Sequence, residues 1–137
     1  MLYLLDTNAL SRLARGMDPA IPQRVRDNLL TCRLSAVAWF ELRYGAARSA
    51  HPEKSVPRLA LLRAVFPTVE MFDEQAARRA ADVRVVLESL RPNAQPIGPY
   101  DVLLAGHALA LGAVLVTHNA REFARVPGLA IEDWQAG

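Results

Sequence analysis

Three carboxylates, Asp6, Glu41 and Asp101, lie beside or inside apolar stretches of this chain. An ionised carboxylate that is buried without a partner is strongly destabilising, so such groups pair with a cation, take up a proton or bind a metal ion. The apolar segment after Asp101, residues 102–116, contains no lysine or arginine. Three acids brought together would repel one another unless a divalent cation lay between them. These residue types therefore indicate a site where oxygen ligands hold a divalent cation.

Each carboxylate also has a simpler structural explanation. Asp6 can act as the N-cap of a helix that starts at Thr7. Asp101 can complement the dipole of a first helical turn. Glu41 can extend its side chain along an apolar face and reach solvent. The sequence leaves these alternatives open for each residue alone, whereas the joint pattern favours a shared site.

The elements that position the acids follow from the apolar pattern. Residues 2–5 form a short apolar run followed by helix-start residues, which predicts a buried strand with Asp6 at its carboxyl end. Helical periodicity predicts a helix of residues 37–48 with a buried face that contains Glu41 together with Val37, Phe40, Tyr44 and Gly45. A proline in the first turn places Asp101 at the start of another helix, whose continuing face is apolar.

The remaining segments alternate between strand and helix. Strands alternating with helices predict an α/β fold with three layers, in which a central parallel sheet is flanked by helices on both sides. In such folds ligand sites form outside the carboxyl ends of the strands, so the acids should converge there. The further strands are expected at residues 33–35, 68–71, 113–117 and 129–132, the helices at 7–15, 22–30, 56–65, 74–90 and 120–123, and a proline-rich loop at 91–99.

The size and composition of the chain fit one globular domain covering residues 1–137, with 52% hydrophobic residues. The longest apolar stretch, residues 102–116, is shorter than the roughly 20 residues that a membrane span needs. We therefore expect a soluble protein with no membrane partner. The single cysteine, Cys32, cannot form an internal disulfide, which fits a cytoplasmic location, and we interpret its thiol as incidental.

The basic residues suggest a nucleic-acid substrate. The net charge is only +2, so any binding of nucleic acid must come from a local patch. Of the 16 basic residues only Lys54 is a lysine, and arginine suits bidentate contact with phosphate, although a GC-rich genome would give the same bias. A basic rim around an acidic centre fits a phosphodiester substrate. The arginines in the first third of the chain are Arg12, Arg15, Arg24, Arg26, Arg43 and Arg48.

An ordered set of segments resembles the PIN-domain ribonucleases and, among them, the VapC toxins of bacterial toxin–antitoxin pairs. The resemblance covers nearly the whole chain, and the ordered set is far more specific than its opening segment alone. The segments are Leu4-Leu5-Asp6-Thr7-Asn8, Glu41 about 35 residues later, Pro96-Ile97-Gly98-Pro99-Tyr100-Asp101, Thr117-His118-Asn119-Ala120-Arg121-Glu122-Phe123 and the terminal Glu132-Asp133-Trp134.

The resemblance implies a metal-dependent endoribonuclease in which Asp6, Glu41 and Asp101 are the acidic metal ligands. Oxygen ligands alone favour Mg²⁺, with Mn²⁺ as a substitute, over zinc. The chain departs from the family at the fourth acidic position, where it carries Asn119. Glu122 follows one helical turn later and is the alternative source of that charge. One or two bound ions, and completion of the site by Asn119 or by Glu122, remain open at this point.

Other polar residues near these motifs have expected supporting roles. Thr7, Asn8 and Thr117 are candidate contacts to phosphate or water, although simple capping explains Thr7 and Asn8 equally well. His107 is expected on a helix surface and His118 in a loop near the site. Both histidines are interpreted as structural residues, because they are separated and have no cysteine partner for zinc.

The resemblance also implies partners. These are a cognate VapB-type antitoxin whose arginine pairs with the acids, an RNA substrate with transfer RNA among the candidates, and DNA reached only through the antitoxin. A homodimer is expected, with the apolar helices at residues 56–65 and 76–90 offering surface for it. The alternative function is a PIN domain with weak or no activity that serves as a binding module, which the residue Asn119 keeps open. Metal-stimulated RNA cleavage separates the two.

Overall fold

Short parallel strands form the centre of the computed structural model, which describes residues 1–90 and 97–135. The strand order across the sheet is β3-β2-β1-β4-β5, and every pairing is parallel. The predicted parallel sheet is therefore confirmed. The strands are β1 (Leu2–Leu5), β2 (Cys32–Ser35), β3 (Val69–Glu70), β4 (Ala113–Val116) and β5 (Ile131–Glu132).

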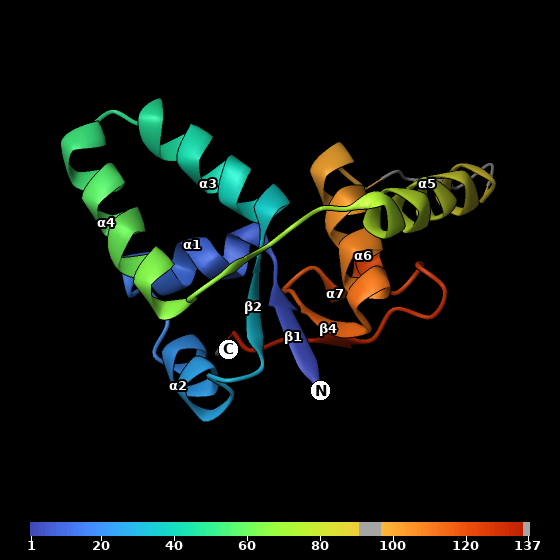
Figure 1. The fold of residues 1–137 in the computed structure, drawn as a ribbon, viewed down its shortest axis with the longest axis horizontal. Helices are drawn as coiled ribbons and strands as arrows, with labels where there is room; N and C mark the ends of the chain where they lie inside the picture. Colours follow the sequence, from blue (N-terminus) through green and yellow to red (C-terminus); the bar gives the residue numbers. More distant parts are fainter. Residues whose placement is uncertain (91–96, 136–137) are drawn as a thin grey trace.

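Helices flank the sheet, as the alternating pattern predicts. In Figure 1, α1 to α4 lie to the left of β1 and β2, and α5 and α6 lie to the right. None of the helices in the described ranges combines the length and the apolar character that crossing a membrane requires. The helices are α1 (Thr7–Arg15), α2 (Ala20–Asp27), α3 (Ala36–Ala47), α4 (Pro52–Val65), α5 (Glu74–Glu88), α6 (Pro99–Leu111) and α7 (Ala120–Phe123).

The central strands β1 and β4 bring two parts of the candidate site together. Leu4 pairs with Leu115 and Leu5 pairs with Val116, and all four side chains are buried. Apolar strands that are covered on both faces are typical of parallel sheets. Because this register ends both strands at the same edge, the residues that follow Leu5 and Val116 lie side by side.

Polar caps start helices directly at this edge. Asp6 accepts a hydrogen bond from the Ala9 N–H at 2.8 Å and so begins α1. Ser35 is the last residue of β2, and its Oγ accepts the Val37 N–H at 3.0 Å to begin α3. An N-cap side chain satisfies one of the unpaired N–H groups of the first turn. Two consecutive strands therefore pass into helices without an intervening loop.

Several predicted boundaries differ from the structure. The predicted helix at 22–30 is α2, shifted towards the N-terminus because Asp18 Oδ1 accepts the Ala20 N–H at 2.9 Å. The predicted helix at 56–65 is α4, which begins earlier at Pro52 and continues through Pro57. Strands β3 and β5 are each two residues long and so shorter than predicted. Residues 91–96 of the predicted loop lie outside the described residues.

Two expectations about burial are wrong. Phe40 and Tyr44 are 52% and 55% exposed, because α3 turns only Val37 of the predicted face into the core, together with Leu42 of the neighbouring face. His107 is only 1% exposed, although it was expected on a helix surface. The reason is that α6 packs against both the sheet and α5, so its middle part has no solvent face.

Close packing of α5 on α6 depends on a glycine. A Cβ atom at Gly106 would lie 2.3 Å from the backbone N of Ala80, which no real contact tolerates. The absence of a side chain lets the two helix backbones approach. Next to it, His107 Nδ1 is 2.9 Å from the Oγ of Ser35, and its ring meets Phe72 edge-on. This contact ties α6 to the end of β2.

Candidate functional site

Asp6 lies at the carboxyl end of β1 and is 6% exposed. Its Oδ1 caps α1, and its backbone N–H donates to the Val116 carbonyl at 2.9 Å. Burial raises the pKa of Asp6, while the hydrogen bonds from the Ala9 N–H and the Thr117 side chain lower it. Asp6 can therefore cap α1 and also belong to the acidic site.

Glu41 is held towards α1 by Thr7, whose Oγ1 donates to Glu41 Oε1 at 2.7 Å. The side chain is half-buried, and burial raises its pKa above the ordinary value. The hydrogen bond from Thr7 lowers this pKa, and the negative charge of Asp6 raises it. The Glu41 carboxylate therefore lies close enough to Asp6 for the charge of Asp6 to raise its pKa.

Besides its burial, three other acids of the site raise the pKa of Asp101. It lies in the first turn of α6, next to Gly98, where an added Cβ atom would be 3.8 Å from Asp101 Oδ2. Burial and, after it, the charges of Asp6, Glu41 and Glu122 in that order together raise the pKa of Asp101 to about 6. The structure therefore brings acidic residues from four segments into one electrostatic cluster.

The segment after β4 supplies Thr117, Asn119 and Glu122. Thr117 Oγ1 accepts the Asn119 N–H at 2.9 Å, which fixes the turn between β4 and α7. The Asn119 side-chain amide donates to Glu122 Oε2 at 3.5 Å. Glu122 is the member of this segment whose charge reaches Asp101, while Asn119 orients Glu122.

Asp133 is a member of the acidic cluster that the sequence reasoning missed. It follows β5 directly, and its charge raises the pKa of Asp6. Its Oδ2 is 2.9 Å from His118 Nδ1, and His118 lowers the pKa of Asp6. The signal was present, because Asp133 follows a predicted strand of a parallel sheet, as Asp6 does. The pair of His118 and Asp133 flanks Asp6 on the side of β5.

The acidic cluster suits a hard divalent cation by its donor chemistry. Its ligands are carboxylate oxygens, which Mg²⁺ and Mn²⁺ prefer. Burial is the largest cause of the raised pKa values of Glu41 and Asp101, and neighbouring negative charges add to it, which is the repulsion that a cation relieves. Within residues 1–90 and 97–135, no three carboxylate, imidazole or thiol groups stand close enough to enclose an ion as they lie. Uncompensated like charges keep their distance, so a cation would have to draw the side chains together.

Some arginines of the predicted basic rim lie close to acidic side chains of the chain itself. Arg24 pairs with Glu132 at 3.0 Å, and Arg12 lies 3.6 Å from Asp18. Arg15, by contrast, lines a groove of about 270 Å³ between α1, α3 and α4, next to Glu41. Cys32 is buried and burial raises its pKa to about 11, which fits the interpretation that its thiol takes no part in chemistry.

Comparison with known proteins identifies the family of this chain. A family model described as the PIN domain matches residues 3–129. The tRNA(fMet)-specific endonuclease VapC of Salmonella typhimurium is 37% identical over 96% of this chain and 97% of its own length. Ribonuclease VapC1 of Haemophilus influenzae is 34% identical over 98% of both chains. The crystal structure of DNA-bound VapBC from Salmonella typhimurium superposes with a TM-score of 0.87 at 37% identity, covering 98% of this chain and 99% of that one. This chain therefore belongs to the PIN-domain family and, within it, to the VapC ribonucleases.

Proposed function

We propose that this chain, acting as a single PIN domain, is the toxin of a toxin–antitoxin pair and a metal-dependent endoribonuclease that hydrolyses phosphodiester bonds in transfer RNA. The observation that carries the proposal is the convergence of Asp6, Glu41 and Glu122 on Asp101, where burial and then the charges of these three acids raise the pKa to about 6. The substrate class follows from the relatives in Salmonella typhimurium and Shigella flexneri, which are named as tRNA(fMet)-specific endonucleases.

The proposed cation ligands are Asp6, Glu41 and Asp101. When bound, Mg²⁺ or Mn²⁺ polarises the scissile phosphate and lowers the pKa of water for attack. Thr7 holds the Glu41 carboxylate in position through the 2.7 Å hydrogen bond. Glu122 adds negative charge from α7 and takes the place of the acid that Asn119 lacks. Asp101 is ionised only above about pH 6, so the site is ready for a cation at neutral pH.

The proposed protein partner is a VapB-type antitoxin. Solved relatives are VapBC assemblies from Salmonella typhimurium and Rickettsia felis, both described with DNA. We propose that an arginine of the antitoxin pairs with the carboxylates and that DNA is bound through the antitoxin. A homodimer is proposed as well, because Leu61 of α4 and Val85 of α5 are large apolar residues exposed at the surface.

A binding module without activity is the second candidate function. The observation that favours it is Asn119, whose amide donates to Glu122 where many PIN domains carry an aspartate. The retained set of Asp6, Glu41 and Asp101 argues against it, because three repelling carboxylates destabilise a fold that has no use for a cation.

Cleavage of initiator transfer RNA tests the proposal. The purified full chain is incubated with tRNA(fMet) in 5′-labelled form, in Mg²⁺, in Mn²⁺ and in EDTA, with an elongator transfer RNA as the control. We expect discrete cleavage products from tRNA(fMet) with either ion and none in EDTA. Equal cleavage of both transfer RNAs would refute the proposed substrate, and the absence of cleavage with both ions would favour the binding module.

A further inference from the structure

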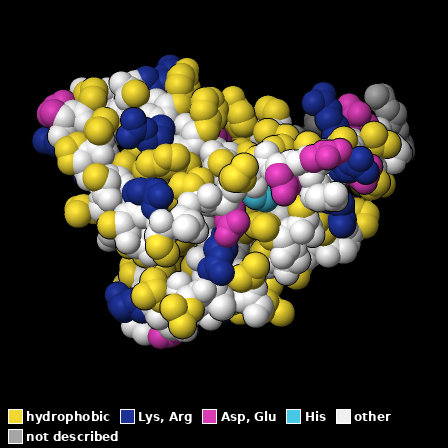
Figure 2. All heavy atoms as spheres, viewed as in Figure 1, with side chains coloured by type: hydrophobic (Ala, Val, Ile, Leu, Met, Phe, Trp, Pro, Cys, Tyr) yellow, Lys and Arg dark blue, Asp and Glu magenta, His cyan; other side chains and the backbone are white. Residues whose placement is uncertain are grey.

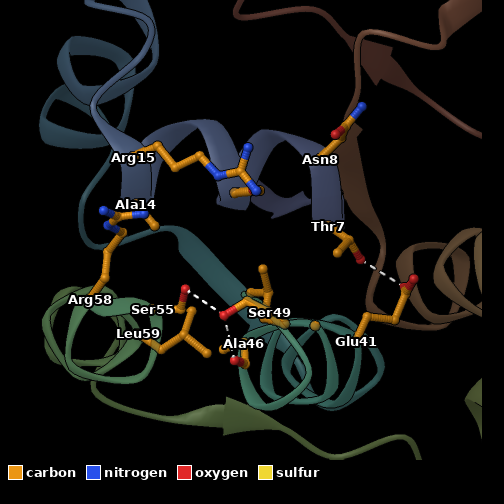
Figure 3. Close-up of a pocket in the computed structure, with 13 residues that line it drawn as sticks. Thr7, Asn8, Ala14, Arg15, Glu41, Ala46, Ser49, Ser55, Arg58 and Leu59 are labelled. Carbon is orange, nitrogen blue, oxygen red and sulfur yellow. Dashed lines mark hydrogen bonds between the residues drawn. The ribbon is translucent and has the colours of Figure 1, made fainter. Parts of the chain in front are cut away.

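A groove runs away from the acidic cluster between α1, α3 and α4. Its volume is about 270 Å³, and Thr7 and Glu41, which are hydrogen-bonded to each other, form one end of it. Arg15 of α1 and Arg58 of α4 line its other part, and Figure 3 shows Arg58 extending from α4 towards α1. The groove and the acidic cluster are therefore continuous through Glu41.

The two arginines of the groove differ from most others in the chain. Both are exposed, and within the described residues neither makes an ion pair or a side-chain hydrogen bond. On α5, by contrast, Arg78 pairs with Glu74 at 2.9 Å, and Figure 2 shows basic and acidic side chains intermingled there. Arg15 and Arg58 thus leave two guanidinium groups available for an external anion.

The rest of the groove suits a phosphodiester backbone. Ser11, Ser49 and Ser55 line it with hydroxyl groups, and Ser49 Oγ lies 3.0 Å from Ser55 Oγ. Hydroxyl and guanidinium groups are the usual protein partners of phosphate oxygens. Leu42 and Leu59 add an apolar floor, which suits the carbon face of a sugar.

The hydrogen bond between Thr7 and Glu41 separates an acidic part of the surface from a basic part. On one side lie the carboxylates, where the scissile phosphate would be cut, and on the other side lie the two arginines. Residues 7 and 15 are separated by about 12 Å along the axis of α1, so the groove reaches a few nucleotides beyond the cut. A planar guanidinium matches two phosphate oxygens at once.

From this arrangement we propose that the groove between α1, α3 and α4 holds the phosphodiester backbone of the RNA substrate on one side of the scissile bond, with Arg15 and Arg58 each contacting a phosphate. The inference rests on the proposed function, since it requires an RNA substrate. It assigns a substrate-positioning role to two arginines that touch none of the candidate metal ligands. An acidic segment of a protein partner is the competing occupant.

The test measures RNA binding separately from cleavage. Fluorescence anisotropy with labelled tRNA(fMet) in EDTA gives the Kd of the full-length wild type, Arg15→Gln, Arg58→Gln and the double variant over a range of salt concentrations. The matched control is Arg79→Gln, an exposed arginine of α5 outside the groove. Each groove variant should weaken binding about five- to twentyfold and reduce the slope of log K against log salt by about 0.7 to 0.9. The control should bind as the wild type does.

Kinetics supply a second readout. With Mn²⁺ present, the groove variants should raise KM and leave kcat nearly unchanged, because the acids remain in place. Arg58→Lys keeps the charge and should recover part of the affinity, which a loss of folding would not allow. Thermal melting of each variant should match the wild type, since both arginines are exposed.

The outcomes distinguish the two proposals. Groove variants that bind tRNA(fMet) with wild-type affinity and salt slope would overturn the groove assignment, even if the wild type cleaves RNA. Loss of binding to a co-expressed antitoxin, with RNA binding intact, would assign the groove to the protein partner instead. A wild type that binds through the arginines but cleaves nothing with either ion would refute the proposed nuclease function and leave the groove assignment standing. A wild type that does not bind the RNA overturns the groove assignment.

Discussion

Thr7 Oγ1 donates to Glu41 Oε1 at 2.7 Å, which joins the first turn of α1 to the middle of α3. These helices begin at the ends of neighbouring strands, β1 and β2. The bond therefore fixes the position of Glu41 relative to Asp6, which immediately precedes Thr7 in the chain. It also marks the boundary between the acidic cluster and the arginine-lined groove.

Removing this hydrogen bond should change the pH dependence of cleavage. In Thr7→Val the side chain keeps its shape but loses the donor, so the pKa of Glu41 should rise further. We expect cleavage at pH 7 to fall about three- to tenfold and the acid limb of the pH–rate profile to move to higher pH. Thr7→Ser should restore both. If the pH–rate profile of Thr7→Val superposed on that of the wild type, the hydrogen bond from Thr7 would have no effect on the role of Glu41.

Asp101 should destabilise the metal-free protein at neutral pH. Its folded-state pKa of about 6 lies above the ordinary value of 3.8, so ionisation is less favourable in the folded than in the unfolded chain. The stability that protonated Asp101 provides is lost as the pH rises from about 4 to 6. Asp101→Asn should therefore raise the Tm in EDTA at pH 7.5 by on the order of a few degrees, with no gain at pH 3.5.

Addition of Mn²⁺ should make the wild type more stable than Asp101→Asn. A cation that binds only the folded state stabilises it, so Mn²⁺ should raise the Tm of the wild type and have less effect on Asp101→Asn. Differential scanning fluorimetry with and without Mn²⁺ measures both effects. An Asp101→Asn protein with lower stability than the wild type in EDTA at pH 7.5 would mean that the acidic cluster is not under repulsion.

Asn119→Asp should strengthen cation binding. The change replaces an amide that donates to Glu122 with a carboxylate, which adds negative charge to the cluster around Asp101. Isothermal titration with Mn²⁺ should give a tighter Kd, by about tenfold, because one more anionic oxygen faces the ion. Glu122→Gln should weaken binding in the same experiment. Equal affinity of Asn119→Asp and the wild type would indicate that Glu122 already completes the site.

His107 should make the fold sensitive to acid. Burial lowers its pKa below the ordinary value of 6.5, although Glu70 and Asp73 act in the opposite direction. The stability that neutral His107 provides is present above pH 6.5 and is lost as the pH falls towards the lowered pKa. His107→Gln should lower the free energy of unfolding by about 1–3 kcal/mol at pH 7.5, because the contact with Ser35 is lost. On acidification, the free energy of unfolding of this variant should fall less than that of the wild type. Urea unfolding at pH 7.5 and 5.5 tests this, and parallel pH dependence of the two proteins would contradict it.

The convergence of the acids was predictable because it follows from topology. Asp6 ends a strand, Glu41 lies in the helix after the next strand, and in a parallel sheet these positions share one edge. The same rule places Thr117 beside Asp6. Asp133 was missed although it obeys the same rule, since it directly follows the strand predicted at residues 129–132.

Burial was less predictable than topology. The apolar residues Phe40 and Tyr44 were expected inside, yet both are exposed, and Phe40 packs on Tyr44 and on Tyr100 at the surface instead. His107 was expected outside, yet it is buried, with its ring against Phe72 and its Nδ1 next to the Oγ of Ser35. Helical periodicity identifies an apolar face, but it does not tell which elements cover that face.

The central claim, that the acids at the carboxyl edge of the sheet form a cation-dependent nuclease site, is tested most directly by the single-turnover cleavage of tRNA(fMet) by Asp101→Asn in saturating Mn²⁺. The matched control is Asp82→Asn, an exposed acid of α5. We predict that the rate falls by at least about 10³-fold in Asp101→Asn and is unchanged in Asp82→Asn. Cleavage by Asp101→Asn at the wild-type rate would contradict a role of this carboxylate in a cation-dependent site.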